Sequence, residues 1–160
     1  MFGLVRIFGS PTRRGAHVLA AANAMLEALA ADGQEANLIR LQRLLVLAQC
    51  RSLAQNGEPI FAERVIVLGD TAAISEIHTA FRRWSFLPIR EPADHPDLDF
   101  AFPADRDERR LAIIRETVDS HCEASGLSLG ALLRRILPEE PNGALLDHDV
   151  LCRAHARIHR

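Results

Sequence analysis

Hydrophobic residues in the first forty positions alternate between short runs and one helical stripe. Residues 4–8 form an apolar run that ends at Gly9, which predicts a buried strand followed by a turn. Apolar side chains then recur at helical spacing over residues 18–29, and Gly33 supplies a stop for that helix. Residues 36–41 predict a second strand. Because such crossovers are right-handed, both strands are expected to lie parallel in one sheet.

The middle of the chain continues this alternation. Residues 64–68 contain an unbroken apolar run, which is typical of a central strand covered on both faces. Asp70 or Thr71 is expected to cap a helix after this strand. The apolar face predicted for that helix extends from Ile74 to Trp84.

After residue 85 the pattern predicts two more strands and then only helices. Two weaker strands are predicted over residues 86–89 and 98–102. Beyond them, apolar stripes at helical spacing predict that residues 104–160 are mainly helical, with a last helix from Ala144 to near the end.

Composition narrows the classes of protein to which the chain can belong. Its 19 basic residues, all arginine, and 21 acidic residues give a net charge of -2, so no general affinity for nucleic acid is expected. No apolar run approaches the roughly 20 residues of a membrane span, and no signal peptide is evident. The three cysteines are odd in number and far apart, which argues against a secreted disulfide framework. We therefore expect one soluble, cytoplasmic domain over residues 1–160.

The turn after the first predicted strand has the features of an anion-binding loop. Backbone N–H groups at the start of the helix can converge on a phosphate, and the hydroxyls of Ser10 and Thr12 can donate to it. Arg13 or Arg14 adds a positive charge. The alternative interpretation is an ordinary surface turn with two solvated arginines.

This turn also begins a resemblance that runs over residues 4–59. The features that carry it are Gly9-Ser10-Pro11 after the first strand, the spacing to Asp32-Gly33, the strand over 36–41 with Gln42-Arg43-Leu44 after it, and Cys50 ahead of Gly57-Glu58-Pro59. In these features the chain resembles the flavodoxin-like NADPH-dependent FMN reductases.

The resemblance implies an α/β fold of the flavodoxin-like, three-layer type, with a central parallel sheet and a helical C-terminal third over residues 104–160. In that family the first loop binds the FMN phosphate. By carry-over, the expected cofactor contacts are Ser10, Thr12, Arg13, Arg14 and Gly15. The implied activity is electron transfer from NADH or NADPH through the flavin to a small-molecule acceptor. Many small reductases of this kind are homodimers, so a dimer is also expected.

A non-enzymatic binding or assembly module on the same fold is the first alternative. The chain has Ala16 and His17 where the family completes its phosphate cradle, and it has no tyrosine to border the flavin ring. On this hypothesis the chain has lost FMN, and it binds a protein partner or a second copy of itself.

A metal- or haem-binding sensor is the second alternative. His148, Cys152, His155 and His159 are spaced four, three and four residues apart, so they share one narrow face of a helix. Imidazole and thiolate groups at this spacing can bind zinc, another transition metal or haem. One straight helix cannot easily surround a metal, so His121 is a candidate ligand from outside it. The competing interpretation is that the imidazoles only border an apolar contact of the helix.

Overall fold

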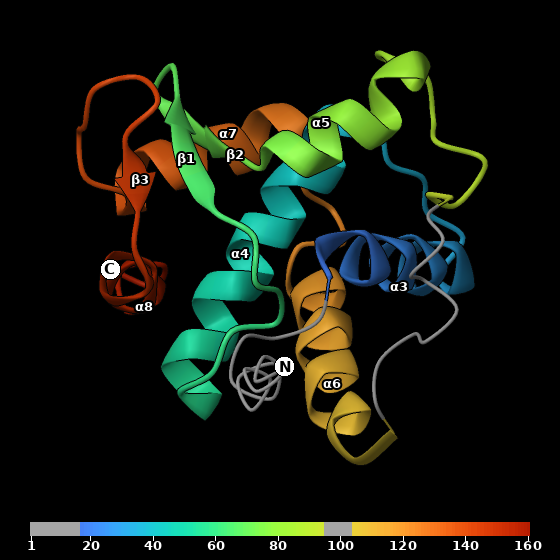
Figure 1. The fold of residues 1–160 in the computed structure, drawn as a ribbon, viewed down its shortest axis with the longest axis horizontal. Helices are drawn as coiled ribbons and strands as arrows, with labels where there is room; N and C mark the ends of the chain where they lie inside the picture. Colours follow the sequence, from blue (N-terminus) through green and yellow to red (C-terminus); the bar gives the residue numbers. More distant parts are fainter. Residues whose placement is uncertain (1–16, 95–103) are drawn as a thin grey trace, which may run out of the picture.

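The computed structural model describes residues 17–94 and 104–160, and for residues 104–107 the backbone alone. This part of the chain is mainly helical, with one small antiparallel sheet in the order β2-β1-β3 (Figure 1). The expected flavodoxin-like fold with a central parallel sheet is therefore wrong. The helices are α3 (Val18–Ala31), α4 (Leu38–Asn56), α5 (Ser75–Phe81), α6 (Ala104–Ser120), α7 (Gly126–Ile136) and α8 (His148–His155), the 3-10 turn is η1 (Arg82–Trp84), and the strands are β1 (Val65–Leu68), β2 (Thr71–Ala73) and β3 (Leu145–Leu146).

Helix α4 is the central element of the fold. The small sheet and α8 lie on one side of it, and α3 and α6 lie on the other (Figure 1). Helix α4 begins at Leu38, within the segment predicted as a strand. The Asn37 side chain caps its first turn by accepting a hydrogen bond from the Arg40 N–H at 2.9 Å. The strand predicted over residues 36–41 is therefore wrong. Since α3 leads directly into α4, the crossover predicted to end at residues 36–41 does not form, and among the described residues both strand pairs are antiparallel.

Strand β1 is found where the apolar run predicts it, but its surroundings differ. It turns back at Gly69 and Asp70, so Leu68 pairs with Thr71 in an antiparallel hairpin. Gly69 adopts a φ of +64°, which a glycine adopts without strain. The helix expected to start at Asp70 or Thr71 is thus delayed, and α5 begins after Ile74. Strand β1 is also not covered on both faces, since Leu68 is exposed.

Two buried glutamines of α4 hold the chain on either side of this hairpin. The Gln49 carbonyl accepts from the Ile60 N–H at 2.8 Å, and its amide donates to the Phe61 carbonyl at 3.0 Å. Gln42 lies two turns earlier on the same face. It accepts from the Ile74 N–H at 2.9 Å and donates to the carbonyl of the same residue at 3.1 Å. Each side chain thereby pairs with backbone groups as a neighbouring strand would.

The C-terminal part is helical, but its last helix is shorter than predicted. Leu145 and Leu146 pair with β1 as an edge strand, so the helix expected from Ala144 starts only at His148. The Asp147 side chain caps it by accepting from the Val150 N–H at 3.0 Å. None of the helices in the described part of the chain is long and apolar enough to cross a membrane.

The remaining predicted strands have different outcomes. Residues 86–89 form a turn instead of a strand, because the Leu87 N–H bonds to the Trp84 carbonyl at 2.8 Å and the Ile89 N–H bonds to the Ala36 carbonyl at 2.9 Å. The strands predicted over residues 4–8 and 98–102 lie outside the described residues.

Candidate functional site

The expected flavin loop lies outside the described residues. This applies to all of its cofactor contacts, which are Ser10, Thr12, Arg13, Arg14 and Gly15. The first residue that the structure places is His17, whose ring nitrogen accepts from the Leu19 N–H at 3.1 Å and caps α3. Flavin binding by this loop stays a prediction.

The histidine and cysteine side chains predicted to form one stripe on the last helix have different surroundings in the structure. His148 lines a polar pocket, whereas the Cys152 thiol lies 3.8 Å from the Leu53 carbonyl of α4. His155 ends the helix, and His159 follows in a separate turn. Within residues 17–94 and 104–160, no three histidine, cysteine or acidic side chains are arranged to hold a metal ion.

His121, His155 and His159 are instead linked by electrostatic interactions that also involve Arg51 of α4. Burial lowers the pKa of His121 and of His155, and the nearby Arg51 and His159 lower both further. The Arg51 guanidinium donates to the Ser120 hydroxyl at 2.9 Å and lies 3.5 Å from the carboxylate of Glu116. A fixed guanidinium beside the imidazoles opposes a bound cation. The sequence analysis names His121 as a candidate ligand from outside the last helix, but an imidazole beside Arg51 fits a metal poorly.

The same cluster predicts that the protein loses stability as the pH falls. Because folding lowers the pKa of His121 and His155 below the ordinary 6.5, the unfolded chain takes up protons first. Their stabilising contribution is complete above pH 6.5 and is lost as the pH falls through the lowered folded values. We expect the urea midpoint to decline between about pH 7.5 and pH 5.5, and His121→Gln and His155→Gln to reduce that decline. His78→Gln, at an exposed position on α5, is the control. If it reduced the decline of the urea midpoint equally, the pH dependence could not be assigned to His121 and His155.

Cys50 offers little nucleophilic chemistry. Cys50 lies in the middle of α4 and is fully buried. Burial raises the pKa of its thiol to about 12, so it stays protonated at neutral pH. Because the thiolate is the reactive form of cysteine, we interpret Cys50 as part of the core.

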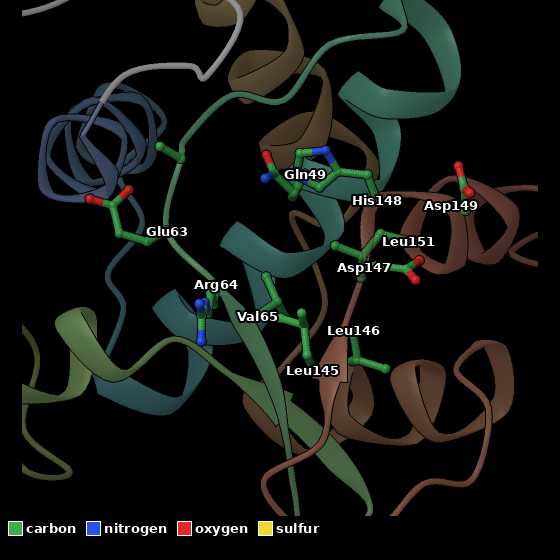
Figure 2. Close-up of a pocket in the computed structure, with 11 residues that line it drawn as sticks. Gln49, Glu63, Arg64, Val65, Leu145, Leu146, Asp147, His148, Asp149 and Leu151 are labelled. Atoms are coloured by element: carbon green, nitrogen blue, oxygen red, sulfur yellow. The ribbon is translucent and has the colours of Figure 1, made fainter. Parts of the chain in front are cut away.

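A polar pocket of about 430 Å³ lies between α4, β1 and the start of α8 (Figure 2). Three of the six polar side chains that line it already have structural roles. Glu63 points toward α3 and accepts from the Val18 N–H at 2.9 Å, Asp147 caps α8, and Gln49 holds the chain at residues 60–61. Half of the pocket's polar side chains therefore serve the fold, which leaves Arg64, His148 and Asp149 for a ligand.

An apolar groove of about 350 Å³ is the stronger candidate. It lies between the first half of α4, the β1–β2 hairpin, α5 and the turn after η1. Phe86 is 76% exposed at its edge and Leu68 is 55% exposed, although both are large apolar side chains. The lining residues are Leu38, Ile39, Gln42, Arg43, Leu68, Thr71, Ala72, Ala73, His78, Arg82, Ser85 and Phe86.

Backbone geometry helps to keep Phe86 exposed. Ser85 adopts a φ of +53°, which is uncommon for a residue with a side chain and reverses the chain after η1. The Leu87 N–H then bonds back to Trp84, so Phe86 stands at the tip of a tight turn. Sequence reasoning missed this groove because it read residues 86–89 as a strand. The available signal was Phe86 next to Leu87 in a segment that follows Arg82 and Arg83.

The groove has a cationic side. Arg43 of α4 is half-buried, and its Nη1 donates to the Gly126 carbonyl of α7. Burial lowers the pKa of Arg43, Arg134 nearby lowers it further, and Asp70 opposes both. Arg82 lies on another element that lines the groove and is exposed. The site therefore combines an apolar floor with two guanidinium groups.

Comparison of the whole chain with known proteins leaves this site without a template. No protein-family model, no curated protein and no solved structure matches the chain, so its likeness to the FMN reductases over residues 4–59 stays an expectation.

Proposed function

We propose that this chain is a non-enzymatic protein-binding module, and that its apolar groove takes side chains from a partner protein. The observation that carries the proposal is the exposure of Phe86 beside a groove of ligand size. Burying a phenylalanine side chain contributes about 2 kcal/mol, so leaving it in water favours a role in binding.

The exposed apolar surface extends beyond the groove, which favours a protein over a small molecule. Leu87 is 65% exposed next to Phe86, and Leu127 is 78% exposed at the start of α7. A methyl group of Ile39, in the groove, lies close to Gly126, so the Leu127 segment adjoins the site. A ligand confined to about 350 Å³ would leave Leu87 and Leu127 in water, whereas a protein surface can cover them.

The groups that line the groove favour binding over catalysis. Among the described residues that line it, none carries a carboxylate or a thiol. The Thr71 hydroxyl donates to the Leu68 carbonyl at 3.3 Å, and the Gln42 amide is held by Ile74. Apart from His78 and Ser85, the groove therefore supplies apolar contact and positive charge, which select a partner more readily than they activate a nucleophile.

A peptide titration tests this proposal. The probe is an amphipathic helical peptide of about four turns, with leucines on one face and glutamines elsewhere. We expect it to bind the full chain, and Phe86→Ala to weaken binding about tenfold, which corresponds to about 1.4 kcal/mol. Trp84, the single tryptophan, adjoins the groove and reports occupancy by its fluorescence. Calorimetry provides the affinity.

The control variant is Leu145→Ala, which removes an exposed leucine outside the groove. It should leave peptide affinity unchanged. Equal weakening by Leu145→Ala, or no binding of the peptide to the unaltered chain at millimolar concentration, would reject the groove as a protein-binding site.

A further inference from the structure

The geometry points to an acidic amphipathic segment of another protein as the occupant of the groove. This inference rests on the proposed function and adds the charge of the partner. Its basis is that apolar and cationic groups line one groove together, in positions that a segment with leucine-like and carboxylate side chains would fill at once.

The positive charges come from different elements and face no carboxylate within the groove. Arg43 lies on α4 and Arg82 on η1, with His78 of α5 as a further lining residue. Within the part of the chain that the structure describes, neither the Arg82 guanidinium nor the His78 imidazole has a hydrogen-bond or ion-pair partner. The Asp70 carboxylate lies 3.4 Å from the Arg134 guanidinium, and its effect on the pKa of Arg43 is smaller than that of Arg134.

Arg43 is held in place before any partner binds. Its guanidinium lies against α7 at Gly130, where an added Cβ would stand 2.6 Å from Nη1. The lack of a side chain at Gly130 therefore makes room for the guanidinium, and the Gly126 carbonyl fixes its orientation. A cation fixed in this way loses little conformational freedom when a carboxylate approaches it.

The apolar base of the groove favours an acidic peptide over other acidic partners. Leu38, Ala72 and Ala73 form the base of the groove, with Phe86 at its edge. A nucleic acid would bring phosphates to the arginines but no aliphatic side chains for this base. A simple anionic amphiphile would fill the groove but not reach Leu87 or Leu127. An acidic amphipathic peptide satisfies both the charges and the apolar surface.

The test compares three helical peptides that share one leucine face. Their polar face carries glutamate, glutamine or lysine. We expect the glutamate peptide to bind about tenfold more tightly than the glutamine peptide at low salt, and the lysine peptide to bind most weakly. The advantage of glutamate should shrink as the salt concentration rises, because exposed charges are screened. Arg82→Glu should abolish the preference, whereas Arg153→Glu, an exposed arginine of α8 outside the groove, should preserve it.

The outcomes separate this inference from the proposed function. If the glutamine and glutamate peptides bind equally well and Arg82→Glu changes neither, the acidic partner is rejected while the groove still binds protein. If no peptide binds, the proposed function fails first. Dodecanoate or a single-stranded oligonucleotide that displaces the glutamate peptide at a lower concentration than the peptide's own Kd would also overturn the inference.

Discussion

Replacing Gln49 with leucine is expected to lower the free energy of unfolding by about 3 kcal/mol. Leucine has nearly the same volume, so the core stays filled. It cannot pair with the Ile60 N–H or the Phe61 carbonyl, and all three residues are completely buried. Each buried backbone group left without a partner costs about 1–3 kcal/mol. Urea unfolding followed by circular dichroism measures the change.

Two further variants give this prediction its controls. Gln55→Leu makes the same substitution at an exposed position of α4, and it should change stability by less than about 0.5 kcal/mol. Gln49→Glu keeps an acceptor for the Ile60 N–H but cannot donate to the Phe61 carbonyl while it is ionised. Because burial would raise the pKa of this new carboxyl group, its deficit should grow as the pH rises above about 4.3. A small, pH-independent loss in both Gln49 variants would show that the amide does not hold the chain.

The sequence predicts α3, α6 and α7, because their apolar stripes are set by local spacing, but it misses α4, which is longer than any of them. The stripe over residues 18–29 becomes α3, and those after residue 103 become α6 and α7. The strand predicted over residues 36–41 shows the limit of this reasoning. Its apolar side chains also fit a helix, and the Asn37 cap decides between the two. That short strand, read as the second half of a crossover, led to the wrong fold class.

The chemistry of the C-terminal stripe was harder to predict than its position. Spacing on an ideal helix places His148, Cys152, His155 and His159 on one face, but α8 ends at His155. Packing against α4 then separates the members, since His148 meets the polar pocket and His155 meets Arg51. Which groups surround a side chain depends on elements distant in sequence, and the guanidinium of Arg51 could not be inferred from the stripe.

The groove could not be predicted for the same reason. Its lining comes from α4, the hairpin, α5 and the turn at Ser85, which together span nearly fifty residues of the chain. No spacing within one helix or strand marks such a site. It also depends on β2, because Ala72 and Ala73 form part of its base only when Thr71–Ala73 is a strand. The sequence analysis predicts that a helix begins at this segment, and a groove at this position does not follow from that prediction.

Replacing Phe81 with alanine is expected to destabilise the protein by about 3–5 kcal/mol. Phe81 is the last residue of α5, and its ring is almost fully buried. Alanine therefore leaves a cavity that the surrounding core cannot fill by small movements. Since domains of this size have only about 5–15 kcal/mol of stability, part of the population should be unfolded at elevated temperature. Thermal unfolding measured by calorimetry tests this.

Phe86→Ala is the matched control, because it removes the same ring from an exposed position five residues later. Its side chain is 76% exposed, so the unfolding free energy should change by less than about 0.5 kcal/mol, while peptide affinity falls about tenfold. Phe81→Ala should show the reverse at a temperature where it stays folded, with a large loss of stability and a small change in affinity. If Phe86→Ala were as destabilising as Phe81→Ala, Phe86 would belong to the core, and its exposure could not support a binding role.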